Sequence, residues 1–214
     1  MEIMGKIRIV VIVLFLGVIC LLNIGAEEKK VNALQEGISK QVIRFHVLAN
    51  SDKAKDQKLK LSVRDAVVEE MQKKLKDIYT KSEAEKIIKA NLGNITKVAE
   101  RTLEKQGCKE KVVAYLTTNE FPVKKYGDTI FPAGKYETLQ VEIGEAKGHN
   151  WWCVMYPSLC MVEEGMARVP DESKKKLKNT LSQEEYDCID EQNVTVEYRL
   201  KIVELWKSMI SKKH

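Results

Sequence analysis

The sequence predicts a single α+β domain, in which an antiparallel or mixed sheet of about five strands carries long amphipathic helices. Two kinds of period lead to this class. Apolar residues alternate with polar ones over residues 43–49 and 138–143, which is the period of a strand. They recur every three to four positions over residues 53–79 and 82–103, which is the period of a helix. The 214 residues suffice for one such domain after a short N-terminal segment.

Residues 1–26 have the order of a secretory signal. Lys6 and Arg8 precede an apolar run at residues 9–22, and Ala26 then stands before a charged stretch. We expect cleavage after Ala26. The alternative is an uncleaved membrane anchor, because the apolar run approaches the roughly 20 residues that a span needs.

The rest of the chain should lie outside the cytoplasm that made it. Residues 27–40 are polar and poorly periodic, so we expect a tether that leads to the domain at residues 41–214. The whole chain has 36 basic and 31 acidic residues and a net charge of +5. This small, interspersed excess predicts no nucleic-acid partner. The membrane contact that we expect is the N-terminal segment, if it is not cleaved.

The first strand and helix are predicted as a consecutive pair. Residues 43–49 should form a strand with one buried face. The Asn-Ser-Asp run at residues 50–52 offers helix-capping side chains, and binding residues also occur at such a place. The amphipathic helix should follow over residues 53–79.

A second helix is predicted to begin at a capping box formed by Ser82 and Glu85. Gly93 and the asparagine after it could divide the helix in two. Gly107 stands where a glycine commonly ends a helix.

The remaining strands follow this helix. Residues 112–117 should form one of them, and residues 121–134 an aromatic, proline-bearing connection. The strands at residues 138–143 and 151–156 should pair as a hairpin around the glycine-containing turn at residues 144–150.

The C-terminal part is less regular. Residues 163–180 are charged and lack an apolar period, which predicts a solvent-exposed insertion. Ser182 and Glu185 form another capping box before a short helix. A strand over residues 194–198 and a helix over residues 200–210 should end the chain.

The run NWWCVMYPSLC at residues 150–160 is the most informative stretch of the sequence. In a strand, adjacent side chains point to opposite faces, so Trp151 and Trp152 cannot share one environment. Either the strand is covered on both faces, or one tryptophan is exposed. An exposed tryptophan is typical of a residue that anchors an interface.

Four cysteines follow the N-terminal segment. Outside the cytoplasm they are candidates for disulfides. Cys153 and Cys160 are the best pair, because Pro157 lies between them and can turn the chain back. Such a small loop would contribute roughly 2.5 kcal/mol by chain entropy. Four cysteines allow three pairings, and Cys108 and Cys188 can equally be buried thiols.

Catalytic and metal chemistry have weak support. His149 lies four residues before Cys153, which makes an envelope thiol hydrolase the alternative function. A zinc site built from His46, His149, Cys153 and Cys160 is disfavoured, because the spacing of the two cysteines is wider than in structural zinc pairs. The chain has no Cys-x-x-Cys, P-loop or dinucleotide-binding motif. We expect no catalytic residue, metal or cofactor.

Four ordered motifs carry a family resemblance. These are IRFHVLANSD at residues 43–52, VRDAV at residues 63–67, FPAGKYE at residues 131–137, and the tryptophan run. Over residues 41–160 the chain resembles the stage II sporulation protein R family of endospore-forming bacteria. Cys108, Cys188 and residues 163–180 lie outside these motifs, so no family role is carried onto them.

The resemblance implies a secreted signalling protein rather than an enzyme. Such proteins are made in the forespore and exported into the space between the two septal membranes. There they trigger a membrane-embedded aspartic protease of the mother cell, which cleaves the precursor of sigma-E. We expect the contact with this protease in and beside the tryptophan run, at Gly148, His149, Asn150, Trp151, Trp152, Tyr156 and Pro157.

Overall fold

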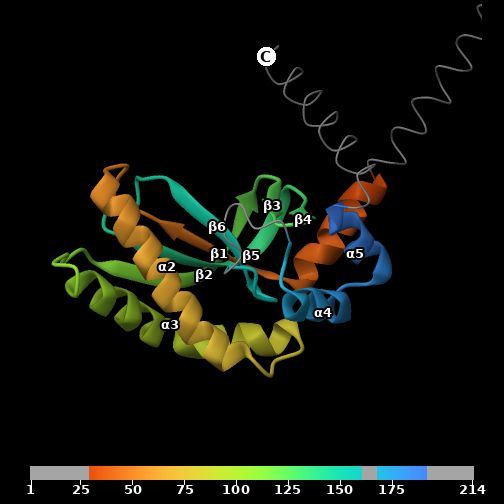
Figure 1. Ribbon diagram of the computed structural model, residues 1–214, viewed down its shortest axis with the longest axis horizontal. Helices are drawn as coiled ribbons and strands as arrows, with labels where there is room; N and C mark the ends of the chain where they lie inside the picture. Colours follow the sequence, from red (N-terminus) through yellow and green to blue (C-terminus); the bar gives the residue numbers. More distant parts are fainter. Residues whose placement is uncertain (1–28, 161–167, 192–214) are drawn as a thin grey trace, which may run out of the picture.

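The computed structural model describes residues 29–160 and 168–191. Four strands form its main sheet: β1 (Ile43–Leu48), β2 (Val112–Phe121), β5 (Gly134–Ile143) and β6 (Asn150–Tyr156). Two long helices pack against this sheet (Figure 1). The α+β class is therefore confirmed. The described part of the chain has four strands in the main sheet, where about five were expected.

The strand order is β2-β5-β1-β6, and the sheet is mixed. β1 pairs parallel with β5 and antiparallel with β6, while β2 pairs antiparallel with β5. The predicted hairpin between β5 and β6 is therefore wrong, because β1 lies between them. The loop after β5 crosses the end of β1, where the nitrogen of Lys147 donates to the carbonyl of Asn50 at 3.3 Å.

Helices α2 (Ala54–Leu75) and α3 (Lys81–Glu104) cover one face of the sheet. Their apolar stripes are buried there. The helix start expected at Ser82 is wrong. Thr80 is the N-cap, and its hydroxyl accepts from the nitrogen of Glu83 at 3.3 Å. Gly93 does not interrupt α3, and Gly107 follows its end with a φ of +70°.

β1 is buried on both faces, although its alternation predicted a half-buried strand. Phe45 and Val47 face the helices, while Arg44 and His46 face the other side. A second small sheet adds to that side. It consists of β3 (Lys124–Tyr126) and β4 (Thr129–Phe131), both within the predicted irregular connection. The polar residues of β1 are therefore covered rather than solvated.

Residues 29–41 are helical and not a polar tether. Ile38 is fully buried, and a Cβ on Gly37 would lie 2.1 Å from the carboxylate of Glu185. Glu185 belongs to α5 (Gln183–Ile189), which lies beside this first helix in Figure 1. The helix at residues 29–41 is therefore docked on the domain, with Ile38 buried in the contact.

The predicted exposed insertion is also partly wrong. Its second half forms α4 (Asp171–Thr180), on which Leu177 is fully buried. Val169 is 2% exposed, and its nitrogen donates to Asp128 at 3.0 Å. One buried leucine in a short charged helix is too little to produce a visible apolar period.

The short helix after Ser182 is confirmed as α5, with its capping box. The strand and helix expected at residues 194–198 and 200–210 lie outside the described residues. Among the helices that the structure describes, none is long and apolar enough to cross a membrane.

Candidate functional site

The loop before β6 touches the loop between β1 and α2. The nitrogen of Gly148 donates to the carbonyl of Ala49 at 2.9 Å. A Cβ on Gly148 would lie 2.3 Å from the carbonyl oxygen of Ser51, so the missing side chain permits this approach. Gly148 was a candidate contact residue, but it is buried and acts as a spacer between two loops.

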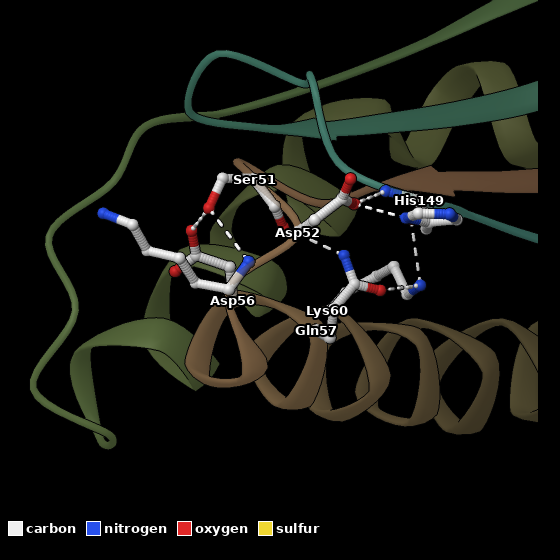
Figure 2. A network of polar contacts seen from close by, with 7 residues as sticks. Ser51, Asp52, Asp56, Gln57, Lys60 and His149 are labelled. Atoms are coloured by element: carbon white, nitrogen blue, oxygen red, sulfur yellow. Dashed lines mark hydrogen bonds and ion pairs between the residues drawn. The ribbon is translucent and has the colours of Figure 1, made fainter.

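A network of polar contacts holds the same junction (Figure 2). Asp52 Oδ1 accepts from the His149 backbone nitrogen at 2.6 Å and contacts its Nδ1 at 2.5 Å. Lys60 Nζ donates to the carbonyl of His149 at 3.0 Å and to Gln57 Oε1 at 2.6 Å. These contacts fix the orientation of His149 while its side chain stays 81% exposed.

This arrangement lowers the pKa of two of its residues. The hydrogen bond from His149 holds the pKa of Asp52 below its ordinary value. Burial lowers the pKa of Lys60, and the positive charge of Arg64 acts in the same direction. The cluster therefore holds His149 in place through an ionised Asp52 and Lys60.

The Asn-Ser-Asp run does not cap α2. The N-cap of α2 is Lys53, and it makes no side-chain cap hydrogen bond. Instead, Asn50 Nδ2 and Ser51 Oγ donate to Asp56 Oδ2 at 3.1 Å and 2.6 Å. Asn50 Oδ1 also accepts from the nitrogen of Glu145 at 2.9 Å. The run therefore ties the strand end to both neighbouring segments.

Trp151 and Trp152 lie on opposite faces of β6, as strand geometry predicts. Trp151 is half-buried on the helix side, where the guanidinium carbon of Arg64 lies 4.1 Å from its ring centroid. Arg64 is also paired with Asp65 at 2.6 Å. The indole Nε1 of Trp151 is buried and has no hydrogen-bond partner in the described part of the chain.

Trp152 is half-buried on the other face. It stacks on His46 with ring centroids 3.8 Å apart and meets Phe121 edge-on at 4.5 Å. Burial lowers the pKa of His46, which is 5% exposed. Neither tryptophan is thus fully exposed: Trp151 packs against the cationic Arg64, and Trp152 packs against the rings of His46 and Phe121.

Beyond His46, this face carries a row of polar side chains across β2 and β5. Gln140 Nε2 donates to Tyr115 OH at 2.9 Å, and the Tyr115 hydroxyl donates to Glu142 at 2.6 Å. Asn119 donates to Gln140. Burial and the neighbouring Glu142 carboxylate raise the pKa of Tyr115 to about 12. These side chains satisfy one another's hydrogen bonds, and Asn119 also lies 3.5 Å from His46 Nδ1 beneath Trp152.

Arg44 is a residue that the sequence did not single out. It is fully buried, and four aromatic rings surround its guanidinium carbon at 4.3 to 5.5 Å, those of Phe121, Tyr126, Phe131 and Tyr136. Its Nη2 donates to Tyr126 OH at 2.9 Å. Tyr126 OH in turn donates to the carbonyl of Trp152 at 3.1 Å. Arg44 therefore joins β1, the small sheet and β6.

A disulfide joins Cys153 to Cys160, with Cα atoms 5.1 Å apart. This is the pair that the sequence favoured. Cys108 and Cys188 are free. The structure gives the thiol hydrolase alternative no nucleophile, because Cys153 is oxidised and 1% exposed. His149 is paired with Asp52 instead.

Tyr156 and Pro157 do not join the two tryptophans. Both are buried, and they line a surface hollow of about 390 Å³ between the end of α2 and α4. The candidate residues thus divide into two places. His149, Asn150, Trp151 and Trp152 are consecutive at the start of β6, with the two tryptophans on opposite faces, and we call this end of the strand the tryptophan end.

Within residues 29–160 and 168–191, no group of three or more histidine, cysteine or acidic side chains could hold a metal ion.

Comparison with known proteins gives a family match. The family model described as stage II sporulation protein R matches residues 39–166, which include the main sheet and the tryptophan end. Stage II sporulation protein R of Bacillus subtilis (strain 168) is 38% identical over 139 residues, which are 65% of this chain. This chain spans 62% of that relative's length. No solved structure matches. Because the family model covers more than half of the chain, the protein belongs to the stage II sporulation protein R family.

Proposed function

We propose that this protein is an exported signal of sporulation, which binds a membrane-embedded aspartic protease of the mother cell and stabilises its active state. The protease then cleaves the precursor of sigma-E. The observation that carries this proposal is the family match over residues 39–166, because that range includes the sheet and the tryptophan end. A ligand of this kind needs only a higher affinity for the active state of its receptor, and no chemistry of its own.

The tryptophan end is the surface that we assign to the receptor. His149 and Asn150 are exposed there, and the half-buried Trp152 lies next to them. The contacts with Asp52 and Lys60 fix this loop before any partner arrives. A preformed surface loses less conformational entropy on binding, which favours affinity.

The test uses the full chain in sporulating cells that lack their own copy, with cleavage of the sigma-E precursor followed by immunoblot. We expect wild type to restore cleavage. His149→Ala and Asn150→Arg should reduce it at least about tenfold, as loss of interface anchors does. Both side chains are exposed, so the fold should be retained.

The matched control is Tyr79→Ala, which removes a 69% exposed aromatic side chain far from the tryptophan end in sequence. This variant should support normal cleavage. Export is checked by the amount of protein on the outer side and by its intact disulfide. Normal cleavage with both tryptophan-end variants would remove the assigned surface. No cleavage with exported wild type would remove the function itself.

A further inference from the structure

The strand β2 is an edge of the main sheet. Within the described part of the chain its neighbour is β5, and all ten residues of β2 pair with β5 without a bulge. Among the described residues no strand pairs with its other edge, which there presents a long, regular row of backbone groups. Natural proteins usually protect such an edge with a charge, a proline or a bulge. Residues 112–119 contain no charge, proline or glycine.

The side chains of this edge are apolar at one end. Val113 is 54% exposed, and Tyr79 is the other large apolar residue with comparable exposure in the described residues. Ala114 and Leu116 are only partly buried against the core on the helix side. Along this edge Val113 is therefore exposed on the face away from the helices, and Ala114 and Leu116 are only partly covered on the helix side.

We propose that β2 pairs antiparallel with β2 of a second copy of this chain, with Ala114 on the two-fold axis. This register is self-complementary. Val113 lies opposite Tyr115 of the second copy, and Val112 opposite Leu116, so each apolar residue within 112–116 meets an apolar one. Residues 117–121 lie opposite residues 107–111, which precede β2. Lys111 lies opposite Thr117, and no two like charges face each other. A two-fold interface uses the same patch on both copies, which this pattern satisfies.

The pairing leaves the proposed receptor surface accessible. β6 is the opposite edge of the sheet, so the two tryptophan ends of the dimer lie at its two outer edges. The dimer does not depend on the proposed signalling function. We assign the β2 edge to a second copy, rather than to an unrelated strand, because the side chains of residues 112–116 complement the same residues of another copy.

The first test is the sedimentation of the full chain in a mild non-ionic detergent over a range of concentrations. We expect a monomer–dimer equilibrium. Val113→Lys places a charge on the edge and should raise the dimer dissociation constant about tenfold or more. The matched control, Tyr79→Lys, should leave it unchanged. A monomer at every concentration, or a dimer that Val113→Lys does not weaken, would overturn the proposal.

The second test is the register. Lys111→Cys and Thr117→Cys are made as separate variants, mixed and mildly oxidised. Opposite Cβ atoms of an antiparallel pair lie about 5 Å apart, so the mixture should cross-link between the two variants. Each variant alone should not, because like positions would lie six residues, or about 20 Å, apart along the strands. Cross-linking of each variant with itself would contradict this register.

Discussion

Single buried polar residues hold the face of the sheet that the long helices do not cover. Arg44 is enclosed by aromatic rings, and His46 lies under the indole of Trp152. His46 Nε2 is buried without a hydrogen-bond partner in the described residues. A neutral imidazole tolerates this environment, whereas a charged one is penalised. The neutral form of His46 is therefore favoured beneath Trp152.

This penalty predicts a loss of stability at mildly acidic pH. Burial lowers the pKa of His46 in the folded chain, while its pKa in the unfolded chain stays near 6.5. As the pH falls through about 6.5, the unfolded chain takes up a proton that the folded chain resists. The free energy of unfolding should therefore decrease from pH 7.5 to pH 5.5. In His46→Gln this decrease should be smaller, as measured by urea unfolding. An equal decrease in both proteins would show that another group is responsible.

At the scale of elements, contacts between loops fix the start of β6, and the Asn-Ser-Asp run serves these contacts rather than capping α2. Residues 50–52 and the loop before β6 hold each other through Gly148, Asp52 and Asn50. This contact sets the angle at which β6 begins and so the position of Trp151 and Trp152. The tryptophan end is therefore as rigid as the junction beneath it.

Alanine substitutions at two glycines should change the free energy of unfolding in opposite directions and so test the tight contact between the two loops. Gly148→Ala forces a Cβ to within 2.3 Å of the Ser51 carbonyl oxygen, and overpacking of this kind should lower the free energy of unfolding by about 2 kcal/mol. Gly93→Ala is the control. Gly93 lies inside α3, and a Cβ there meets nothing within 4 Å. This substitution should raise stability by about 1 kcal/mol, because alanine is the better helix former. Urea unfolding of both variants decides; a neutral Gly148→Ala would show that the two loops can separate without cost.

At the scale of the whole molecule, β1 organises the fold. It lies between β5 and β6. One of its faces carries residues of the helix-side core, and the other carries Arg44 and His46. The disulfide then joins the middle of β6 to Cys160, where the chain leaves the sheet. Tyr156 and Pro157 lie inside this small loop and pack near the end of α2. The disulfide thus holds the segment after β6 next to this edge strand.

Removal of this bond should weaken the whole domain. The double variant Cys153→Ser with Cys160→Ser should lose about 2.5 kcal/mol of unfolding free energy, because the unfolded chain regains the entropy of an open loop. Cys188→Ser changes a thiol that makes no disulfide and is the control. Urea unfolding with and without a reductant gives the comparison. If reductant shifted the unfolding of wild type no more than that of the double variant, the bond would not contribute to stability.

Much of the fold and part of the site could be predicted from local pattern. The periods of α2 and α3, the capping box of Ser182 and the close spacing of Cys153 and Cys160 all act over a few residues. The opposite placement of the two tryptophans follows from strand geometry alone. α4 was missed because it buries too few apolar residues to show a period. In the helix at residues 29–41, Val31, Leu34 and Ile38 have helical spacing, but three apolar residues over about two turns are a short signal among polar ones.

The sequence by itself determined the secondary structure of the core and the family of this protein, and it favoured Cys153 and Cys160 as the disulfide pair without excluding other pairings. Only the tertiary structure decided that β1 separates β5 from β6 and that Arg44 and His46 are buried. The physical reason is distance along the chain. A strand's period records which of its faces is apolar, but its neighbours and the cover on its polar face come from residues about a hundred positions away. Arg44 is buried by Phe121, Tyr126, Phe131 and Tyr136, and no local pattern around Arg44 contains them.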